Sequence, residues 1–286
     1  MDFLLSFLNS MPGALGQGLI WGIMAIGVYI TYRILDVADL TVDGSLATGG
    51  AQCALGITLG WNPWEALIVA ILAGILTQLA LYSVNLRIMG GKANTPIGVD
   101  KYDLLVSQRY VRDLTLDNPI PLVLVILAVL IGILYWFFGT EYGSSLRATG
   151  ANQNMARAQG INTNWTKVLG LVVSNGLVAF SGALLSQYQG SATVDMGRGA
   201  IVIGLAAVII GEVLLGKVFR NFALKLLSAV IGAIIYYIVI TLVLRLGLET
   251  TDLKLLTALV VAVFLTIPHW KGKFAKTGKK GDAAHA

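Results

Sequence analysis

The feature that most constrains this chain is a series of long segments that contain no charged residue. A helix needs about 20 apolar residues to cross a hydrocarbon core of about 30 Å. Because lipid cannot satisfy exposed backbone groups, such segments must be helical when they span a membrane. Two shorter segments, 199–211, which can extend through Glu212 to 216, and 255–268, follow the same logic and bring the expectation to about eight spans. The six long segments are 14–32, 44–64, 66–86, 118–140, 168–194 and 226–244.

Composition agrees with a membrane interior. Only 12% of the 286 residues are charged, against about a quarter in soluble domains, and the mean hydropathy is +0.78. Five of the six tryptophans lie at or near the ends of the apolar segments, where aromatic rings favour the headgroup region. Trp21 is the exception, and we expect it to pack inside a bundle. The fold class predicted is therefore all-α, a polytopic membrane helical bundle.

The apolar segment 44–64 is unusually rich in helix-weakening residues. It contains five glycines and Pro63. A broken or re-entrant segment is as compatible with this composition as a plain span.

Charged connections predict which ends of the helices face the cytoplasm. Basic residues concentrate in the connections 141–167 and 217–225 and in the tail 271–286, whereas the connections 189–197 and 247–252 carry acids and no basic residue. The positive-inside rule places the three basic segments in the cytoplasm. By parity, the loop 90–117 is external. We expect one transmembrane domain over 1–270 and a basic cytoplasmic tail over 271–286, with lipid and not nucleic acid as the tail's neighbour.

No catalytic motif is evident. The segment 211–218 approaches a nucleotide-binding P-loop, but Val218 replaces the hydroxyl that holds magnesium and the context is a membrane segment. Cys53 is the one cysteine, which rules out a disulfide within the chain. We expect no catalytic residue, metal site or cofactor in this chain, so any energy source must come from a partner.

A short cytoplasmic helix is predicted within the loop 141–165. Gly150 and Gly160 bracket it, Asn152 is a plausible N-cap, and Met155 shares a face with Ala158. Such a weakly apolar, cationic helix suits docking in a groove of another protein. From the residues alone, an ordinary interfacial helix is equally compatible.

Charged residues between the apolar segments 14–32 and 44–64, polar residues inside the segment 168–194 and the acid of the segment 199–216 mark candidate path residues. Arg33 and Asp36 are three residues apart and would pair on one helical face. Asp43 would cap a following half-helix; a membrane-surface loop is the alternative for all of these. The small-residue pairs of the segment 168–194 favour close helix packing over ligand binding. The candidates for the translocation path are Asp36, Asp39, Asp43, Asn175, Gln187 and Glu212.

Several motifs together resemble one known family. They are Arg147-Ala148-Thr149-Gly150, the segments 155–162, 169–179, 181–190, 201–212 and 252–259, and in the first half 32–45 and 81–90. These resemble permeases of bacterial ATP-binding-cassette importers, within the branched-chain amino-acid and ribose permease superfamily. The branch most similar is the one paired with tryptophan/tyrosine-type binding proteins.

The resemblance implies a multi-pass protein of the bacterial inner membrane, with a cytoplasmic C-terminus. It also implies a cytoplasmic ATPase subunit that holds ATP and magnesium, a second permease copy in a homodimer, and an external substrate-binding protein or lipoprotein. The solute expected is an amino acid, with an aromatic one as the narrower expectation. The residues implied in ATPase coupling are Arg147, Gly150, Asn152, Met155, Arg157 and Gly160.

One departure from the family affects the first half. The region before 81–90 is about one segment shorter than is usual in the family, so the topology there stays open. A rival function is a self-sufficient ion-coupled secondary transporter or channel, with Asp36, Asp39, Asp43 or Glu212 as coupling carboxylates.

Overall fold

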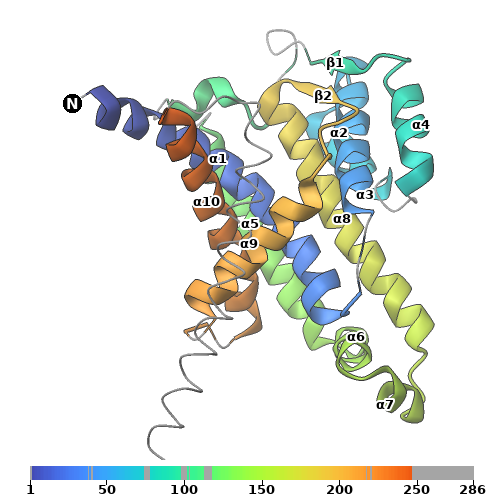
Figure 1. The fold of residues 1–286 in the computed structure, drawn as a ribbon. Helices are drawn as coiled ribbons and strands as arrows, with labels where there is room; N and C mark the ends of the chain where they lie inside the picture. Colours follow the sequence, from blue (N-terminus) through green and yellow to red (C-terminus); the bar gives the residue numbers. More distant parts are fainter. Residues whose placement is uncertain are drawn as a thin grey trace, which may run out of the picture.

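The computed structural model describes residues 2–37, 39, 41–73, 78–97, 102, 104–112, 118–216, 218–219 and 221–246. The expected span 255–268, the motif 252–259 and the basic tail 271–286 lie outside the described residues. Within them the chain is a bundle of helices with one pair of short strands (Figure 1). In order they are α1 (Asp2–Tyr29), the π-helix η1 (Ile30–Ile34), α2 (Val42–Thr58), α3 (Pro63–Ala73), α4 (Gln78–Ile88), β1 (Asn94–Pro96), the 3-10 helix η2 (Gln108–Arg112), α5 (Pro119–Gly139), α6 (Glu141–Ala151), α7 (Gln153–Ala158), α8 (Thr163–Gln189), β2 (Ser191–Thr193), α9 (Ala200–Leu215) and α10 (Phe222–Arg245).

Among the described residues, four helical stretches are long and apolar enough to cross a membrane: Leu4–Ile34, Pro119–Gly139, Thr163–Gln189 and Phe222–Arg245. This confirms the all-α polytopic bundle. Residues 74–77 of the span expected over 66–86 lie outside the described residues, and on either side of them are α3 and α4, which have 11 residues each. Each is about 16 Å long, roughly half the hydrocarbon thickness.

The glycine-rich segment 44–64, for which a broken segment and a plain span were both left open, forms the continuous helix α2 up to Thr58 and then turns at Gly60 before α3 begins. A Cβ at Gly49 would overlap the carbonyl of Ala179, and one at Gly182 would overlap that of Leu46. The glycines therefore allow α2 and α8 to approach backbone to backbone instead of interrupting the helix. A further non-helical stretch lies earlier, between η1 and α2.

The two ends of the bundle carry different structures. β1 pairs antiparallel with β2, with Thr95 opposite Ala192, which places the connection after α4 and the connection after α8 on one side. Helices α6 and α7 lie at the opposite end (Figure 1). The described start of the loop 90–117 and the connection 189–197 thus share one side, as parity predicted, and the basic connection 141–167 lies on the other.

α1 and α8 form the centre of the bundle, while α5 lies outside. Most of the apolar window of α1 is buried (83%), whereas only 22% of that of α5 is. Trp21 is buried and its ring lies 5.7 Å from that of Tyr237, which confirms its packing role. The outward face of α5 is left for lipid or a partner subunit.

Candidate functional site

The helices α6 and α7 form a projection at one end of the molecule (Figure 1). α7 has six residues, and the Asn152 side chain accepts hydrogen bonds from the backbone N–H groups of Asn154 and Met155, both at 3.0 Å. This confirms Asn152 as the N-cap. Beyond the helix, Gly160 has φ +79°, the left-handed conformation expected of a glycine after a helix end.

The short helix α7 lies between Gly150 and Gly160, as predicted, although Gly150 does not itself follow a helix end. Gly150 lies inside α6, and a Cβ at this position would overlap the carbonyl oxygen of Ile34 in η1. The glycine is needed because α6 approaches the backbone of η1 too closely for a side chain. α6 therefore lies in direct backbone contact with the end of the first span.

Side-chain contacts fasten α7 to the start of α8. Arg157 Nε donates to Thr163 Oγ1 at 2.8 Å, and Lys167 Nζ donates to Gln153 Oε1 at 2.9 Å. Met155 remains 63% exposed on this braced projection. The projection presents an apolar side chain on a short, stiff helix, which is a geometry that can enter a groove of another protein.

A buried polar cluster lies where the chain enters α2. Asn175 Nδ2 of α8 donates to Asp39 Oδ2 at 2.9 Å, and Ser45 Oγ donates to Asn175 Oδ1 at 2.6 Å. The Thr41 hydroxyl lies within hydrogen-bond distance of both Asp39 Oδ1 and Asn175 Oδ1, and the Thr41 backbone N–H donates to Asp39. Irregular backbone inside a bundle is tolerated when its polar groups are satisfied within the protein.

Asp43 caps a distant helix and not its own. Its carboxylate accepts hydrogen bonds from the backbone N–H groups of Gly199 and Ile201 at the start of α9, both at 2.9 Å. The N-terminal dipole of α9 thereby meets an anion supplied by α2. The expectation that Asp43 caps the half-helix that follows it is wrong, because α2 already begins at Val42.

Arg33 pairs with a residue of α9 instead of Asp36. Its Nε lies 2.9 Å from Glu212 Oε1, with side-chain exposures of 59% and 32%. Asp36 is exposed and has φ +52° in the turn after η1. The i, i+3 pair predicted on one helical face does not form, because the helix ends at Ile34.

Gln187 is fully buried, and its side chain binds the backbone of the loop that contains Leu105. Its Oε1 accepts from the backbone N–H of Leu105 at 3.1 Å, and its Nε2 lies 3.4 Å from Cys53 Sγ. Of the six path candidates, the structure brings together only Asp39 and Asn175. Thr41 and Ser45 were missed as their partners, although an Asp followed two residues later by Thr is a known turn pattern that would have indicated the first.

Comparison with known proteins gives one family. The model of branched-chain amino acid transport system permease components matches residues 10–95 and 94–267. A tyrosine transport system permease protein of Clostridioides difficile (strain R20291) is 36% identical over 295 residues, covering 96% of each chain. The uncharacterized protein RP368 of Rickettsia prowazekii (strain Madrid E) is 34% identical over 284 residues, covering 91% of this chain and 98% of that one. The xylose transport system permease protein XylH of Haemophilus influenzae is 34% identical over 122 residues, 41% of this chain and 30% of XylH.

Proposed function

This chain belongs to the family of branched-chain amino acid transport system permease components, and from that premise we propose that it imports an amino acid with energy supplied by a separate ATPase. Membrane spanning and the permease role follow from the family and the four apolar stretches. The proposal adds the direction of transport, the partners and the solute. ATP and magnesium reside on the ATPase, and this chain contributes the path.

The contact with the ATPase is assigned to the projection formed by α6 and α7. The observation that carries this assignment is a capped and braced helix, α7, that presents Met155 to solvent. Arg147, Gly150, Asn152, Met155, Arg157 and Gly160 are the residues proposed for coupling. Force received there reaches the bundle through the close contact between Gly150 and Ile34.

The solute proposed is an amino acid, and an aromatic one is the narrower proposal. Support comes from the tyrosine transport permease, which is similar over 96% of both chains. Selection resides in an external binding protein, and two copies of the permease enclose the path between them. The C-terminus is proposed to be cytoplasmic.

Ion coupling by buried carboxylates is the rival function. Asp39 and Asp43 are engaged by hydrogen bonds inside the protomer, and Glu212 is paired with Arg33. A coupling carboxylate must exchange its ion with the path, so these contacts favour structural roles for the three acids.

The decisive experiment changes Met155 to Asp in a permease co-expressed with its proposed ATPase subunit. A charge carried into the apolar groove costs several kcal/mol, so we expect the affinity for the ATPase to fall on the order of 100-fold. Co-purification and amino-acid-dependent ATP hydrolysis in proteoliposomes are the measurements.

The control is Leu59→Asp. Leu59 is equally exposed, at 64%, and follows α2 at the other end of the bundle. This variant should keep the ATPase. If Met155→Asp also keeps it, or if the purified chain alone moves tyrosine down a sodium or proton gradient, the proposed function is wrong.

A further inference from the structure

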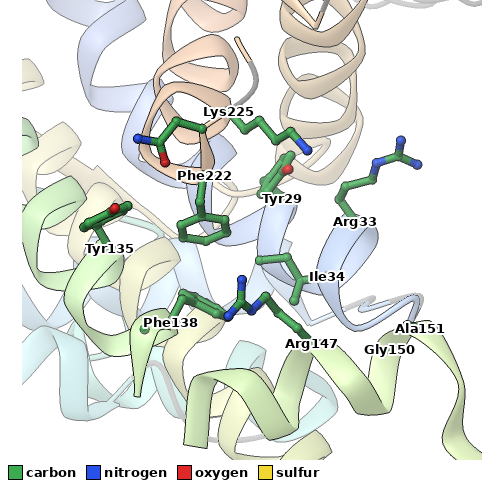
Figure 2. Close-up of a pocket in the computed structure, with 12 residues that line it drawn as sticks. Tyr29, Arg33, Ile34, Tyr135, Phe138, Arg147, Gly150, Ala151, Phe222 and Lys225 are labelled. Atoms are coloured by element: carbon green, nitrogen blue, oxygen red, sulfur yellow. The ribbon is translucent and has the colours of Figure 1, made fainter. Parts of the chain in front are cut away.

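A cavity of about 700 Å³ opens beside the projection, at the junction of four helices. It lies between the end of α1 with η1, the end of α5, α6 and the start of α10 (Figure 2). Its lining residues are Tyr29, Arg33, Ile34, Tyr135, Phe138, Gly139, Arg147, Gly150, Ala151, Asn221, Phe222 and Lys225.

The charge in this cavity is positive. Arg147 extends from α6 toward Phe138, and Lys225 enters from α10 beside Tyr29 (Figure 2). Neither side chain forms a hydrogen bond or ion pair with another described residue, whereas Arg33 is already paired with Glu212. No Asp or Glu is among the described residues that line the cavity. Two cations therefore face it without a counter-charge.

The remaining lining combines aromatic rings with neutral polar groups. The rings of Phe138 and Phe222 pack with centroids 4.8 Å apart. The Tyr29 hydroxyl and the Asn221 amide add neutral groups able to donate hydrogen bonds. The cavity thus offers hydrogen-bond donors and positive charge beside two packed aromatic rings.

The position of the cavity at the ends of the membrane helices indicates a lipid as its ligand. The lining includes Gly139, where α5 ends, and Phe222, where α10 begins, so the cavity lies at the level of the helix ends. On the outward face of α5, the exposed residues Leu124, Ala128 and Tyr135 form a stripe at helical spacing that leads to it. Acyl chains can follow this stripe while the headgroup enters the cavity.

We propose that the cavity binds the phosphate group of an anionic phospholipid, with Arg147 and Lys225 as its counter-charges. Basic pockets between transmembrane helices on the cytoplasmic side hold such headgroups. A zwitterionic amino acid is a poorer fit, because its ammonium group would face two cations and no carboxylate. The same phosphate chemistry is found in soluble phosphates, so the test separates the two sources.

The test titrates delipidated permease–ATPase complex in detergent and counts bound ligands by native mass spectrometry. The probes are phosphatidylglycerol, phosphatidylcholine, glycerol 3-phosphate and tyrosine. Phosphatidylglycerol should bind most tightly, and Lys225→Gln and Arg147→Gln should each weaken it about 5-fold, the effect of one basic residue near an anionic surface. Lys225→Arg should retain it. Because Arg147 is also proposed for coupling, lipid retention and not transport is the readout.

Lys167→Gln is the matched control, since Lys167 lies at the same end and is bound to Gln153 outside the cavity. It should leave phosphatidylglycerol binding unchanged. Equal binding of the two lipids, or equal losses in Lys225→Gln and Lys167→Gln, would overturn the proposal. If glycerol 3-phosphate binds as tightly as phosphatidylglycerol, the ligand is a soluble phosphate and not a lipid. If tyrosine displaces phosphatidylglycerol, the cavity is a solute site.

Discussion

At the scale of single residues, the Asn175 amide joins α8 to the entry of α2. It donates to Asp39 and accepts from Ser45, and both partners are buried. Asn175→Leu should lower the free energy of unfolding by about 1–3 kcal/mol, because the Asp39 carboxylate loses a donor that water cannot replace. Thermal unfolding of the purified protein in detergent measures the loss.

Asn164→Leu is the control for this prediction, because Asn164 is exposed; it should change stability by less than about 0.5 kcal/mol. Combining Asp39→Leu with Asn175→Leu should destabilise less than the sum of the two single changes, since no buried carboxylate is then left unsatisfied. Strict additivity would contradict the hydrogen-bonded pair.

Two glycines inside helices offer an internal comparison at the same scale. Gly150→Ala should destabilise by about 1–3 kcal/mol, because the added Cβ meets the backbone of Ile34, which cannot yield without moving η1. Gly132→Ala in α5 meets no atom within 4 Å and should be neutral or stabilising by up to about 1 kcal/mol. The shift in melting temperature is measured for each variant. Shifts of the same sign and size in the two variants would contradict the close contact between α6 and η1.

At the scale of elements, the start of α9 depends on a carboxylate from α2. Asp43→Ala should cost about 0.5–2 kcal/mol, the usual cost of removing an N-cap. Hydrogen exchange should rise locally at the amides of Gly199 and Ile201, which lose their acceptor. Asp195→Ala is the control, because Asp195 pairs with Arg198 on the surface and both side chains are exposed. Faster exchange spread evenly over the chain would argue against a local cap.

At the scale of the whole molecule, the sidedness of the bundle can be tested by thiol labelling. Cys53 is buried, so Cys53→Ala gives a cysteine-free background with little surface change. In intact spheroplasts, an impermeant maleimide should label Lys92→Cys, before β1, but not Asn154→Cys, in α7. Asn154→Cys should be labelled only after the membrane is permeabilised. The reverse pattern would invert the orientation derived from the basic connections.

Individual long helices could be predicted from the sequence because the length of an apolar run is a local property. The segment 168–194 was recognised from the length of its apolar run, and α8 covers Thr163–Gln189. The N-cap at Asn152 and the helix end at Gly160 could also be predicted, since each depends on backbone groups only a few residues away in the chain. The basic connections could be identified by counting the charged residues between apolar segments.

The partners of the charged residues were decided by tertiary structure alone. Asp43 caps Gly199, a residue 156 positions away, and Arg33 pairs with Glu212 of α9 instead of Asp36. A carboxylate accepts whichever donors the crossing of helices brings within about 3 Å, and that crossing is set by where glycines let backbones meet. The sequence by itself determined a membrane bundle with a basic side; the packing at Gly49, Gly150 and Gly182 decided which polar groups it brings together.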